Sequence, residues 1–327
     1  MKAILVNDDR SLSWDNVPDP IMGEDDCLVK IEAAALNRAD LMQREGDYPP
    51  PPGCPPWMGL EISGVIVDMA AGAKEKSRWK IGDRVCALLG GGGYAQYANI
   101  KYDMLMPVPQ NCSMIEAAAM PEAFATAYLN LFLEGGAKAG DTLLMTGGNS
   151  GLASVTIRMA KAFGLYVITT VRGATKADAI RDLGADVIVD TTKERLADVL
   201  KAQLDSGRGV DVAIDCLGGE DMGECLRYLK HGARWIMIAA LAGTKTEIDL
   251  KNIYVRNVRI IGSTLRSRAP AMKAQILANL VEQVWPKVES GAVKPTIYQV
   301  LPIEEAEAAQ EILYRGQNVG KVVLAVK

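Results

Sequence analysis

A glycine-rich turn between an apolar strand and a helix, within residues 142–163, constrains the fold of this chain more than any other feature. Residues 142–146 (TLLMT) predict the strand, and the turn that follows leads into the helix. Gly148 permits a tight turn, and Gly151 lets backbone amides at the helix N-terminus approach phosphate groups. Ala153 still allows the helix to pack closely on a sheet. This arrangement is typical of a pyrophosphate site, although a plain strand-to-helix connection can have the same pattern.

The chain around this turn alternates helix and strand. Strands are predicted at 142–146, 166–171, 187–189, 212–215, 235–239 and 258–261, and helices at 122–134, 151–163, 176–183, 194–204 and 221–230. The segment 235–239 is continuously apolar, which suits a parallel sheet buried on both faces. Six such strands predict a doubly wound parallel sheet of the Rossmann type, which binds a dinucleotide at the turn after its first strand.

The end of the second predicted strand indicates which dinucleotide binds. An NAD site usually carries an acidic residue about 20 positions after the glycine turn, where it bonds the ribose hydroxyls. This chain has no acid there, because the strand ends in Val171, Arg172 and Gly173, and Lys176 follows. A 2′-phosphate would meet two cations, so NADPH is favoured over NADH. The alternative is that Arg172 and Lys176 are solvated surface charges.

The size and charge of the chain restrict its class. Its 327 residues exceed the size at which a single core usually stops growing, which predicts two domains. With 36 basic and 40 acidic side chains the net charge is −4, which does not attract nucleic acid or anionic lipid. No apolar run is long enough to cross a bilayer, and the N-terminus turns acidic too early for a signal peptide. We therefore expect a cytoplasmic protein that binds neither nucleic acid nor membranes.

Histidine and cysteine usage restricts the chemistry further. His231 is the only histidine, which excludes a metal site with two imidazoles and leaves one candidate for a Ser-His-Asp triad. The six cysteines contain no C-x-x-C pair and are expected to be free thiols. His231 lies between Lys230 and Gly232, which predicts a helix C-terminus where a cation meets the helix dipole.

Residues 1–110 have the pattern of short strands separated by turns, which predicts an all-β module. The proline-rich segment 49–56 lacks amide donors and is expected to be an extended surface loop. Ser113 and Glu116 form a capping box that starts a helix and marks a boundary. Beyond the parallel series, a helix at 271–288, a strand at 297–301, a helix at 304–314 and a strand at 320–326 are predicted. Periodicity does not indicate which module these segments join.

Motifs along the whole chain carry a family resemblance. They are the segments 35–44 (ALNRADLMQR), 59–64 (GLEISG), 80–83 (KIGD), 121–122 (PE), 265–268 (LRSR) and 318–321 (NVGK). With the glycine turn and the capping box, they resemble the zinc-free NADPH:quinone oxidoreductases of the medium-chain dehydrogenase/reductase superfamily. The chain is most similar to the tumour-suppressor-inducible quinone oxidoreductases, and zeta-crystallin is a more distant likeness.

The resemblance implies that the C-terminal segment returns to the first module. The fold class would then be α/β, with a GroES-like β-rich catalytic domain at 1–118 and 264–327 and a Rossmann NADPH-binding domain at 119–263. It also implies a homodimer in which two cofactor-domain sheets pair at their edges. Zinc-dependent members would have a cysteine at Asn37, a histidine at Leu60 and usually a cysteine near Glu122, so no bound metal is expected.

A reductase without a metal must deliver hydride to an acceptor that is already electrophilic and whose reduced anion is delocalised. Quinones fit this description best. The resemblance implies two catalytic groups, Tyr48 near the nicotinamide and Asn37, whereas the alternatives are packing beside prolines for Tyr48 and a bond to nearby backbone for Asn37. The cofactor-binding residues that it implies are Thr126, Gly148, Ser150, Gly151, Leu152, Arg172, Lys176, Leu217, Leu241, Asn318 and Lys321.

Three functions therefore remain open from the sequence. The first is zinc-independent reduction of quinones by NADPH, and the second is NADPH-dependent reduction of α,β-unsaturated carbonyls, namely enones, enals or acyl thioesters. An acyl thioester would need a basic channel, for which Arg266 and Arg268 are candidates. The third is a non-catalytic NADPH-binding protein of the crystallin type. In the resemblance, Thr191 stands where several relatives have a tyrosine beside the cofactor, which predicts weaker contacts with the adenosine.

Overall fold

The computed structural model describes residues 1–327 and divides them into two compact units. The first unit comprises Met1–Ala125, Arg266–Gly291 and Pro295–Lys327, and the second comprises Thr126–Leu265 and Ala292–Lys294. The sequence predicts domain limits at 118 and 263, whereas the division into compact units falls at 125 and 265. The domain limits therefore stay a prediction.

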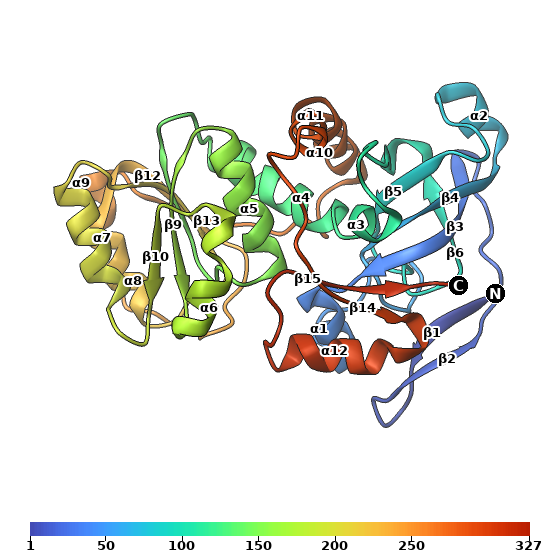
Figure 1. Cartoon of the computed structure of the whole chain (residues 1–327), viewed down its shortest axis with the longest axis horizontal. Helices are drawn as coiled ribbons and strands as arrows, with labels where there is room; N and C mark the ends of the chain where they lie inside the picture. Colours follow the sequence, from blue (N-terminus) through green and yellow to red (C-terminus); the bar gives the residue numbers. More distant parts are fainter. The chain divides into compact units, whose positions relative to one another are not determined.

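The second unit is built on a six-stranded parallel sheet (Figure 1). In spatial order the strands are β10 (Val187–Asp190), β9 (Tyr166–Val171), β8 (Thr142–Met145), β11 (Val210–Asp215), β12 (Leu229–Met237) and β13 (Arg259–Gly262). The helices are α5 (Gly151–Ala162), α6 (Ala174–Ala179), α7 (Leu196–Asp205), α8 (Asp221–Cys225) and α9 (Leu250–Arg256), and Leu129–Glu134 is π-helical. All six predicted strands are confirmed. The strand order reverses at β8, which is where ligands bind in sheets of this kind.

Apolar side chains bury the faces of this sheet. Leu144, Ile168, Ala213 and Trp235 are fully or almost fully buried, in one cluster with apolar residues of α7 and α8. A parallel sheet needs crossover helices on its faces, which explains why its strands are apolar without alternation. The core therefore fixes the carboxyl ends of β8, β9 and β11, from which the candidate cofactor residues extend.

The prediction of a helix from 221 to 230 is wrong at its C-terminal end. A 3-10 turn follows α8, and β12 begins at Leu229. Leu229 is buried, and the Lys230 ammonium pairs with Asp211 at 2.8 Å, so contacts with the neighbouring strand hold this segment in the sheet. His231 therefore lies in a strand and not at a helix C-terminus, and its Nε2 lies 2.8 Å from Nδ2 of Asn257.

The first unit contains a mostly antiparallel seven-stranded sheet (Figure 1). Its strands run in the order β14 (Ile297–Pro302), β15 (Lys321–Ala325), β3 (Asp26–Ala35), β4 (Glu61–Met69), β5 (Arg84–Leu88) and β7 (Leu105–Pro107), with β6 (Tyr97–Lys101) paired to β3. β1 (Lys2–Val6) and β2 (Leu12–Asn16) form a hairpin. The helices are α1 (Arg38–Glu45), α2 (Ala71–Lys76), α3 (Met114–Ala118), α10 (Pro270–Gln283), α11 (Trp285–Glu289) and α12 (Ala306–Tyr314), and α4 (Pro121–Tyr128) leads into the second unit. The C-terminal strand β15 pairs with β3, which joins the end of the chain to the N-terminal sheet.

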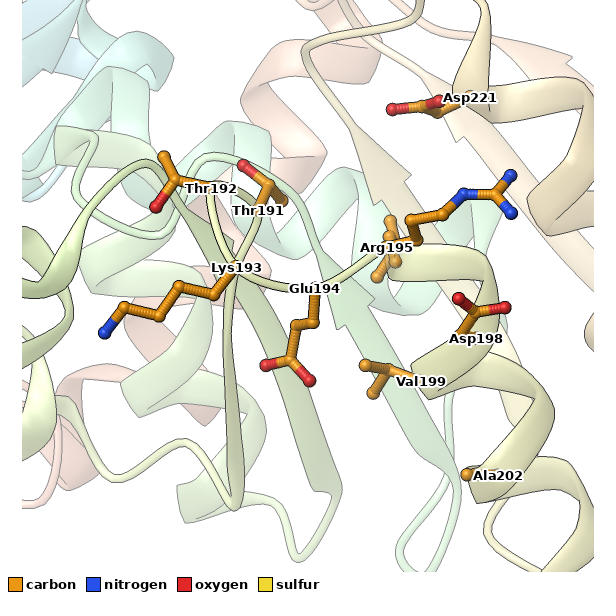
Figure 2. A pocket seen from close by; sticks show the side chains of 10 residues that line it. Thr191, Thr192, Lys193, Glu194, Arg195, Asp198, Val199, Ala202 and Asp221 are labelled. Atoms are coloured by element: carbon orange, nitrogen blue, oxygen red, sulfur yellow. The ribbon is translucent and has the colours of Figure 1, made fainter.

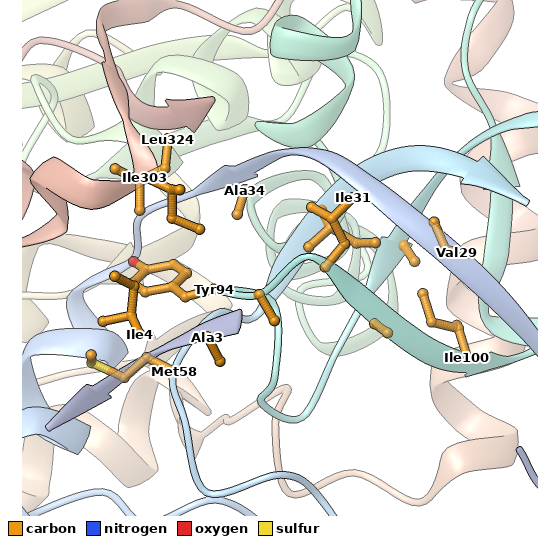
Figure 3. Packing of buried hydrophobic residues seen from close by; sticks show 14 of the residues in the cluster. Ala3, Ile4, Val29, Ile31, Ala34, Met58, Tyr94, Ile100, Ile303 and Leu324 are labelled. Carbon is orange, nitrogen blue, oxygen red and sulfur yellow. The ribbon is translucent and has the colours of Figure 1, made fainter. Parts of the chain in front are cut away.

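Figure 3 shows the main core of the first unit, in which Tyr94 lies with Ile4 and Met58. All three side chains are almost completely buried. Local predictions hold in this unit where they rest on short-range bonds: Glu116 N donates to Ser113 Oγ at 3.2 Å, and Ser113 N donates to the Glu116 carboxylate at 2.8 Å. This capping box starts α3, as predicted. No helix has the length and apolar character needed to cross a membrane.

The predicted helix at 271–288 is divided into α10 and α11. Pro286 lies in the first turn of α11, where its missing N–H leaves no hydrogen bond unmade. A proline in the middle of one continuous helix would remove a bond and clash with the preceding turn, so the break falls just before it.

Candidate functional site

The glycine turn after β8 has the geometry of a phosphate-binding loop. Gly147 adopts a left-handed φ of 68°, and Gly148 N donates to Thr170 O at 2.7 Å. A Cβ atom at Gly148 would lie 2.5 Å from Thr169 Oγ1, so only glycine fits against β9. Ser150 is the N-cap of α5 and accepts from Ala153 N at 3.1 Å. These bonds fix the turn so that the first amides of α5 are available to an anion.

A buried carboxylate shapes the neighbouring loop after β11. Asp215 accepts hydrogen bonds from Thr146 Oγ1 at 2.8 Å, from Leu217 N at 2.8 Å and from Trp235 Nε1 at 3.1 Å. It lies at the carboxyl end of β11 and is 1% exposed. Leu217, a predicted cofactor residue, is therefore held in place by Asp215. Sequence reasoning placed this strand end near the ligand but missed the organising role of the acid.

Asp190 organises the end of the sheet where the adenosine ribose is expected. Its carboxylate accepts from Gly173 N at 2.8 Å and from Thr192 Oγ1 at 2.7 Å, and these two bonds together with that of Thr192 N lower its pKa. Asp190 thereby ties the loop after β9, which contains Arg172, to the loop after β10. Arg172 is exposed and Lys176 is half-exposed, and neither is drawn into an ion pair. Their charges remain available to a phosphate.

An open cavity of about 670 Å³ lies beside this strand end (Figure 2). Its lining comes from the loop after β10, the start of α7 and the first residue of α8: Thr191, Thr192, Lys193, Glu194, Arg195, Leu196, Asp198, Val199, Ala202 and Asp221. Thr191 lines the cavity, and its hydroxyl donates to Val171 O at 3.2 Å. A small side chain here leaves the cavity open next to the predicted adenosine site.

The first unit holds a buried ion pair beside Asn37. The Lys321 ammonium lies 2.5 Å from Glu61 Oε1, and the two side chains are 4% and 0% exposed. The same ammonium donates to Asn37 Oδ1 at 2.7 Å and to Leu36 O at 2.6 Å. Asn37 Nδ2 donates to Glu61 Oε1 at 3.0 Å. The structure therefore brings together two predicted site residues, Asn37 and Lys321, with Glu61 between them.

Two further contacts extend this network. Glu61 Oε2 accepts from the backbone N of Glu122, at the start of α4, at 2.9 Å. Asp40, one turn into α1, accepts from Asn37 N at 2.8 Å, from Gly59 N at 3.0 Å and from the Tyr94 hydroxyl at 3.0 Å. Complete burial raises the pKa of Asp40 to about 6, against the effect of these three bonds. The segment that contains Asn37 is thus fixed from both ends.

Tyr48 is held by Arg266. The guanidinium carbon lies 4.8 Å from the centre of the Tyr48 ring, and Nη1 donates to Tyr48 O at 3.0 Å. Arg266 also donates to Gly90 O at 2.9 and 2.6 Å and to Gln43 Oε1 at 2.7 Å. All of these acceptors are neutral, although Arg266 is only 6% exposed. Burial raises the pKa of Tyr48, and the Arg266 charge opposes that shift.

The residue Lys273 of α10 lies close to this clamp. Its ammonium donates to Arg266 O at 2.9 Å, and burial lowers its pKa. The Glu122 charge is close enough to add to the raised pKa of Tyr48 and to oppose in part the lowered pKa of Lys273. Because Glu122 also bonds Glu61, the surroundings of Tyr48 and of Asn37 adjoin. Neither the Arg266 clamp nor the Lys321 ion pair was predicted from the sequence, since their partners are far apart in the chain.

The remaining predicted cofactor residues are placed as follows. Thr126 O accepts from Asn130 Nδ2 at 2.8 Å, and the Leu241 side chain is 52% exposed. Asn318 Nδ2 donates to Gly320 O at 2.7 Å in the turn before β15. Thr126 and Leu241 belong to the second unit with Leu152, whereas Asn318 and Lys321 belong to the first. Their binding roles stay predictions.

The residues around Asn37 do not fit a zinc ion. Leu60 has no donor atom, and the oxygens of Asn37 and Glu61 already bond the Lys321 ammonium. Nowhere in the chain do three or more histidine, cysteine, aspartate or glutamate side chains group as a metal would require. The oxygens that Asn37 and Glu61 could offer a metal are therefore already bonded by a cation of the chain itself.

These two units define a nucleotide-binding α/β oxidoreductase, and comparison with known families specifies which. Residues 23–110 match the alcohol dehydrogenase GroES-like domain, and residues 151–282 match the family described as zinc-binding dehydrogenase. The chain belongs to the medium-chain dehydrogenase/reductase superfamily. The predicted fold class is confirmed: a GroES-like β-rich domain and a Rossmann domain that binds NAD(P).

Individual relatives are similar over nearly the whole chain. The quinone oxidoreductase of Mus musculus is 29% identical over 93% of this chain and 90% of its own length. A solved NAD-dependent alcohol dehydrogenase is 28% identical with a TM-score of 0.84, and the match covers 100% of both chains. A mycobacterial protein solved with NADPH has a TM-score of 0.86 at 24% identity, covering 99% of this chain and 100% of that one.

Proposed function

We propose that this protein is a zinc-independent reductase that transfers hydride from NADPH to quinones. The observation that carries the proposal is the Lys321–Glu61 ion pair, which occupies the donors beside Asn37 where a metal would have to bind. Without a Lewis acid, only an acceptor whose reduced anion is delocalised receives hydride readily. The quinone oxidoreductase of Mus musculus, which is similar over most of this chain, is named for the same substrate class and supports the proposal.

The preference for NADPH rests on charges in the second unit. Arg172 and Lys176 follow β9 and no acidic side chain stands at 171–177, so a 2′-phosphate would be attracted and not repelled. The backbone amides after Gly148 and at the start of α5 would hold the pyrophosphate. Asp190 fixes the loop that contains Arg172 without occupying its side chain. These residues fit the cofactor that the sequence favours.

When bound, NADPH supplies the hydride. A quinone that received this hydride with both its electrons would become a hydroquinone monoanion, and one proton from water would complete the hydroquinone. The residues of this chain stabilise the charge that develops on the acceptor oxygen: Tyr48 by its hydroxyl and Asn37 by its amide. Arg266 keeps the Tyr48 ring in one orientation.

We also propose that two copies of the chain pair through their second units. β13 is an edge strand of the parallel sheet, and Ile260 on it is 42% exposed. Leu250 and Tyr254 of α9 are 73% and 68% exposed. An open strand edge with large apolar side chains beside it favours pairing with a second edge.

The test of the main proposal is oxidation of NADPH and of NADH by purified, chelator-treated protein with an ortho-quinone, a para-quinone and an enone. NADPH-specific turnover of quinones supports it. Turnover of the enone alone would change the assignment to alkene reduction, and tight NADPH binding without any turnover would favour a non-catalytic role. Loss of quinone turnover on chelation, restored by zinc, would contradict a metal-free mechanism.

A further inference from the structure

We infer that Lys321 is a positioning residue that acts through Asn37. With Glu61, its ammonium fixes the Asn37 amide so that one Nδ2–H is left to donate to the oxygen of a bound acceptor. The inference rests on the proposed function and specifies the acceptors that this site takes: those whose reduced oxygen is a delocalised anion.

The hydrogen bonds of the Lys321 ammonium use all of its N–H groups. Its three N–H groups match three acceptors, Leu36 O at 2.6 Å, Asn37 Oδ1 at 2.7 Å and Glu61 Oε1 at 2.5 Å. An ammonium has no donor beyond these three, so Lys321 has none left for a phosphate of the cofactor. We therefore assign Lys321 to the support of Asn37 in place of the cofactor contact that the family resemblance implied.

The two donors of the Asn37 amide differ in how strongly they are held. One Nδ2–H donates to Glu61 Oε1 at 3.0 Å, whereas the other has only a long contact of 3.4 Å with Ala35 O. The oxygen of the amide is fixed by the ammonium, so the amide cannot rotate to exchange the two. The weakly held N–H is the one available to an acceptor oxygen.

Electrostatics sets the class of acceptor. The Lys321 cation on Oδ1 draws electron density from the amide and strengthens its N–H as a donor. A single amide donor stabilises a delocalised phenolate oxygen but gives far less than a Lewis acid to the localised alkoxide of a simple alcohol. Primary and secondary alcohols are therefore not expected to be substrates, although a solved structure with this fold is described as an alcohol dehydrogenase.

The test is a double-mutant cycle on the full-length protein with NADPH. One arm is Lys321→Met with Glu61→Gln, which removes both buried charges together and leaves a neutral amide oxygen at position 61 to accept from Glu122 N. The second arm is Asn37→Ala, and the third variant combines all three substitutions. A matched control, Lys161→Met with Asp186→Asn, neutralises a half-exposed ion pair of the second unit, 2.7 Å long.

We expect Asn37→Ala to lower kcat for an ortho-quinone by roughly 100-fold, the usual loss for one donor to an oxyanion. The variant with Lys321→Met and Glu61→Gln should lose roughly tenfold or more in kcat, with little change in the KM for NADPH. The same two substitutions should not lower kcat further when Asn37 is already alanine. The control pair should leave kcat unchanged. Multiplicative losses in folded variants would overturn the inference, because they would show that Lys321 does not act through Asn37.

A second measurement separates this inference from the proposed function. The dissociation constant of 4-nitrophenolate, a delocalised oxyanion, is measured for the same variants saturated with NADP⁺. If the wild-type protein reduces no quinone, the proposed function fails, and the cycle is evaluated on phenolate binding alone. Coupling between Lys321 and Asn37 in that binding supports the inference, whereas additive effects or an absence of phenolate binding overturn it.

Discussion

Arg266 stacks on the ring of Tyr48, with 4.8 Å between its guanidinium carbon and the ring centre, and donates to the carbonyl of the same residue at 3.0 Å. The same guanidinium bonds Gly90 O and Gln43 Oε1, and Gln43 in turn donates to Pro56 O at 2.8 Å. One buried cation therefore joins both ends of the proline-rich loop to the turn after β5. The clamp and the prolines together restrict the conformations that this loop can adopt.

Replacing Arg266 by methionine should loosen the loop around Tyr48. Gly90 O and Gln43 Oε1 would lose their donor inside the protein, which we expect to cost roughly 2–4 kcal/mol of unfolding free energy. Arg266→Lys should not restore the loop, because one ammonium cannot reach all three acceptors and stack on the ring. Urea unfolding and steady-state kinetics with a quinone measure both effects. A fully active, stable Arg266→Lys variant would show that the clamp is not required.

Removing the two cations after β9 should change the cofactor preference. In Arg172→Ala combined with Lys176→Ala we expect the KM for NADPH to rise roughly 10- to 100-fold, since each charged bond to a phosphate is worth about a factor of ten. The KM for NADH, which has no 2′-phosphate, should change little. Lys201→Ala, which removes an exposed charge paired with Asp205 on α7, is the control. Equal effects on both cofactors would mean that neither cation contacts the 2′-phosphate.

Adding one methyl group at Gly148 should abolish tight cofactor binding. A Cβ atom there would lie 2.5 Å from Thr169 Oγ1, and Thr169 is buried with its hydroxyl donating to Met145 O at 2.7 Å. The turn must move, which should destabilise the protein by about 1–3 kcal/mol and displace the start of α5. Lys201→Ala, which changes an exposed side chain of α7, is the control. Thermal unfolding and titration with NADPH distinguish the two variants.

The Asp40 carboxyl should make stability depend on pH. Burial raises its pKa in the folded protein to about 6 from 3.8, so the folded state favours the protonated form. Its contribution is fully present below pH 4 and is lost as the pH rises through 6, a change of roughly 3 kcal/mol. The difference in unfolding free energy between wild type and Asp40→Asn should therefore fall across this range, as measured by urea unfolding at several pH values. A difference that is constant with pH would contradict the raised pKa.

The proposed dimer should separate when the exposed apolar edge becomes charged. We expect Tyr254→Glu combined with Ile260→Lys to yield monomers that retain their fold, since these side chains are 68% and 42% exposed in the single chain. Tyr314→Glu, at an equally exposed tyrosine of the first unit, should leave the assembly unchanged. Sedimentation velocity gives the mass of each species. A wild-type protein that sediments as a monomer would contradict the proposal.

Short-range bonds explain which parts of the structure could be predicted from the sequence. The turn at Gly148 and the capping box of Ser113 with Glu116 depend on residues within a few positions of one another, so their pattern alone specifies them. The break before Pro286 also has a local cause, because a proline cannot continue the preceding helix. The apolar periodicity continues across this break and does not reveal it. His231 could not be placed in this way. The local pattern predicts a helix around it, whereas pairing with β11, which no nearby residue indicates, makes the segment a strand.

The sequence by itself therefore determined the Rossmann series, the β-rich module, the absence of the usual zinc ligands and the cationic end of β9. Only the tertiary structure decided that Lys321 meets Asn37 and Glu61, since β15 must pair with β3 before residues 284 positions apart can share a hydrogen bond. Arg266 and Tyr48 likewise meet across 218 positions. Local propensity acts over a few residues, whereas the buried charges of this site find their partners through sheet register and core packing.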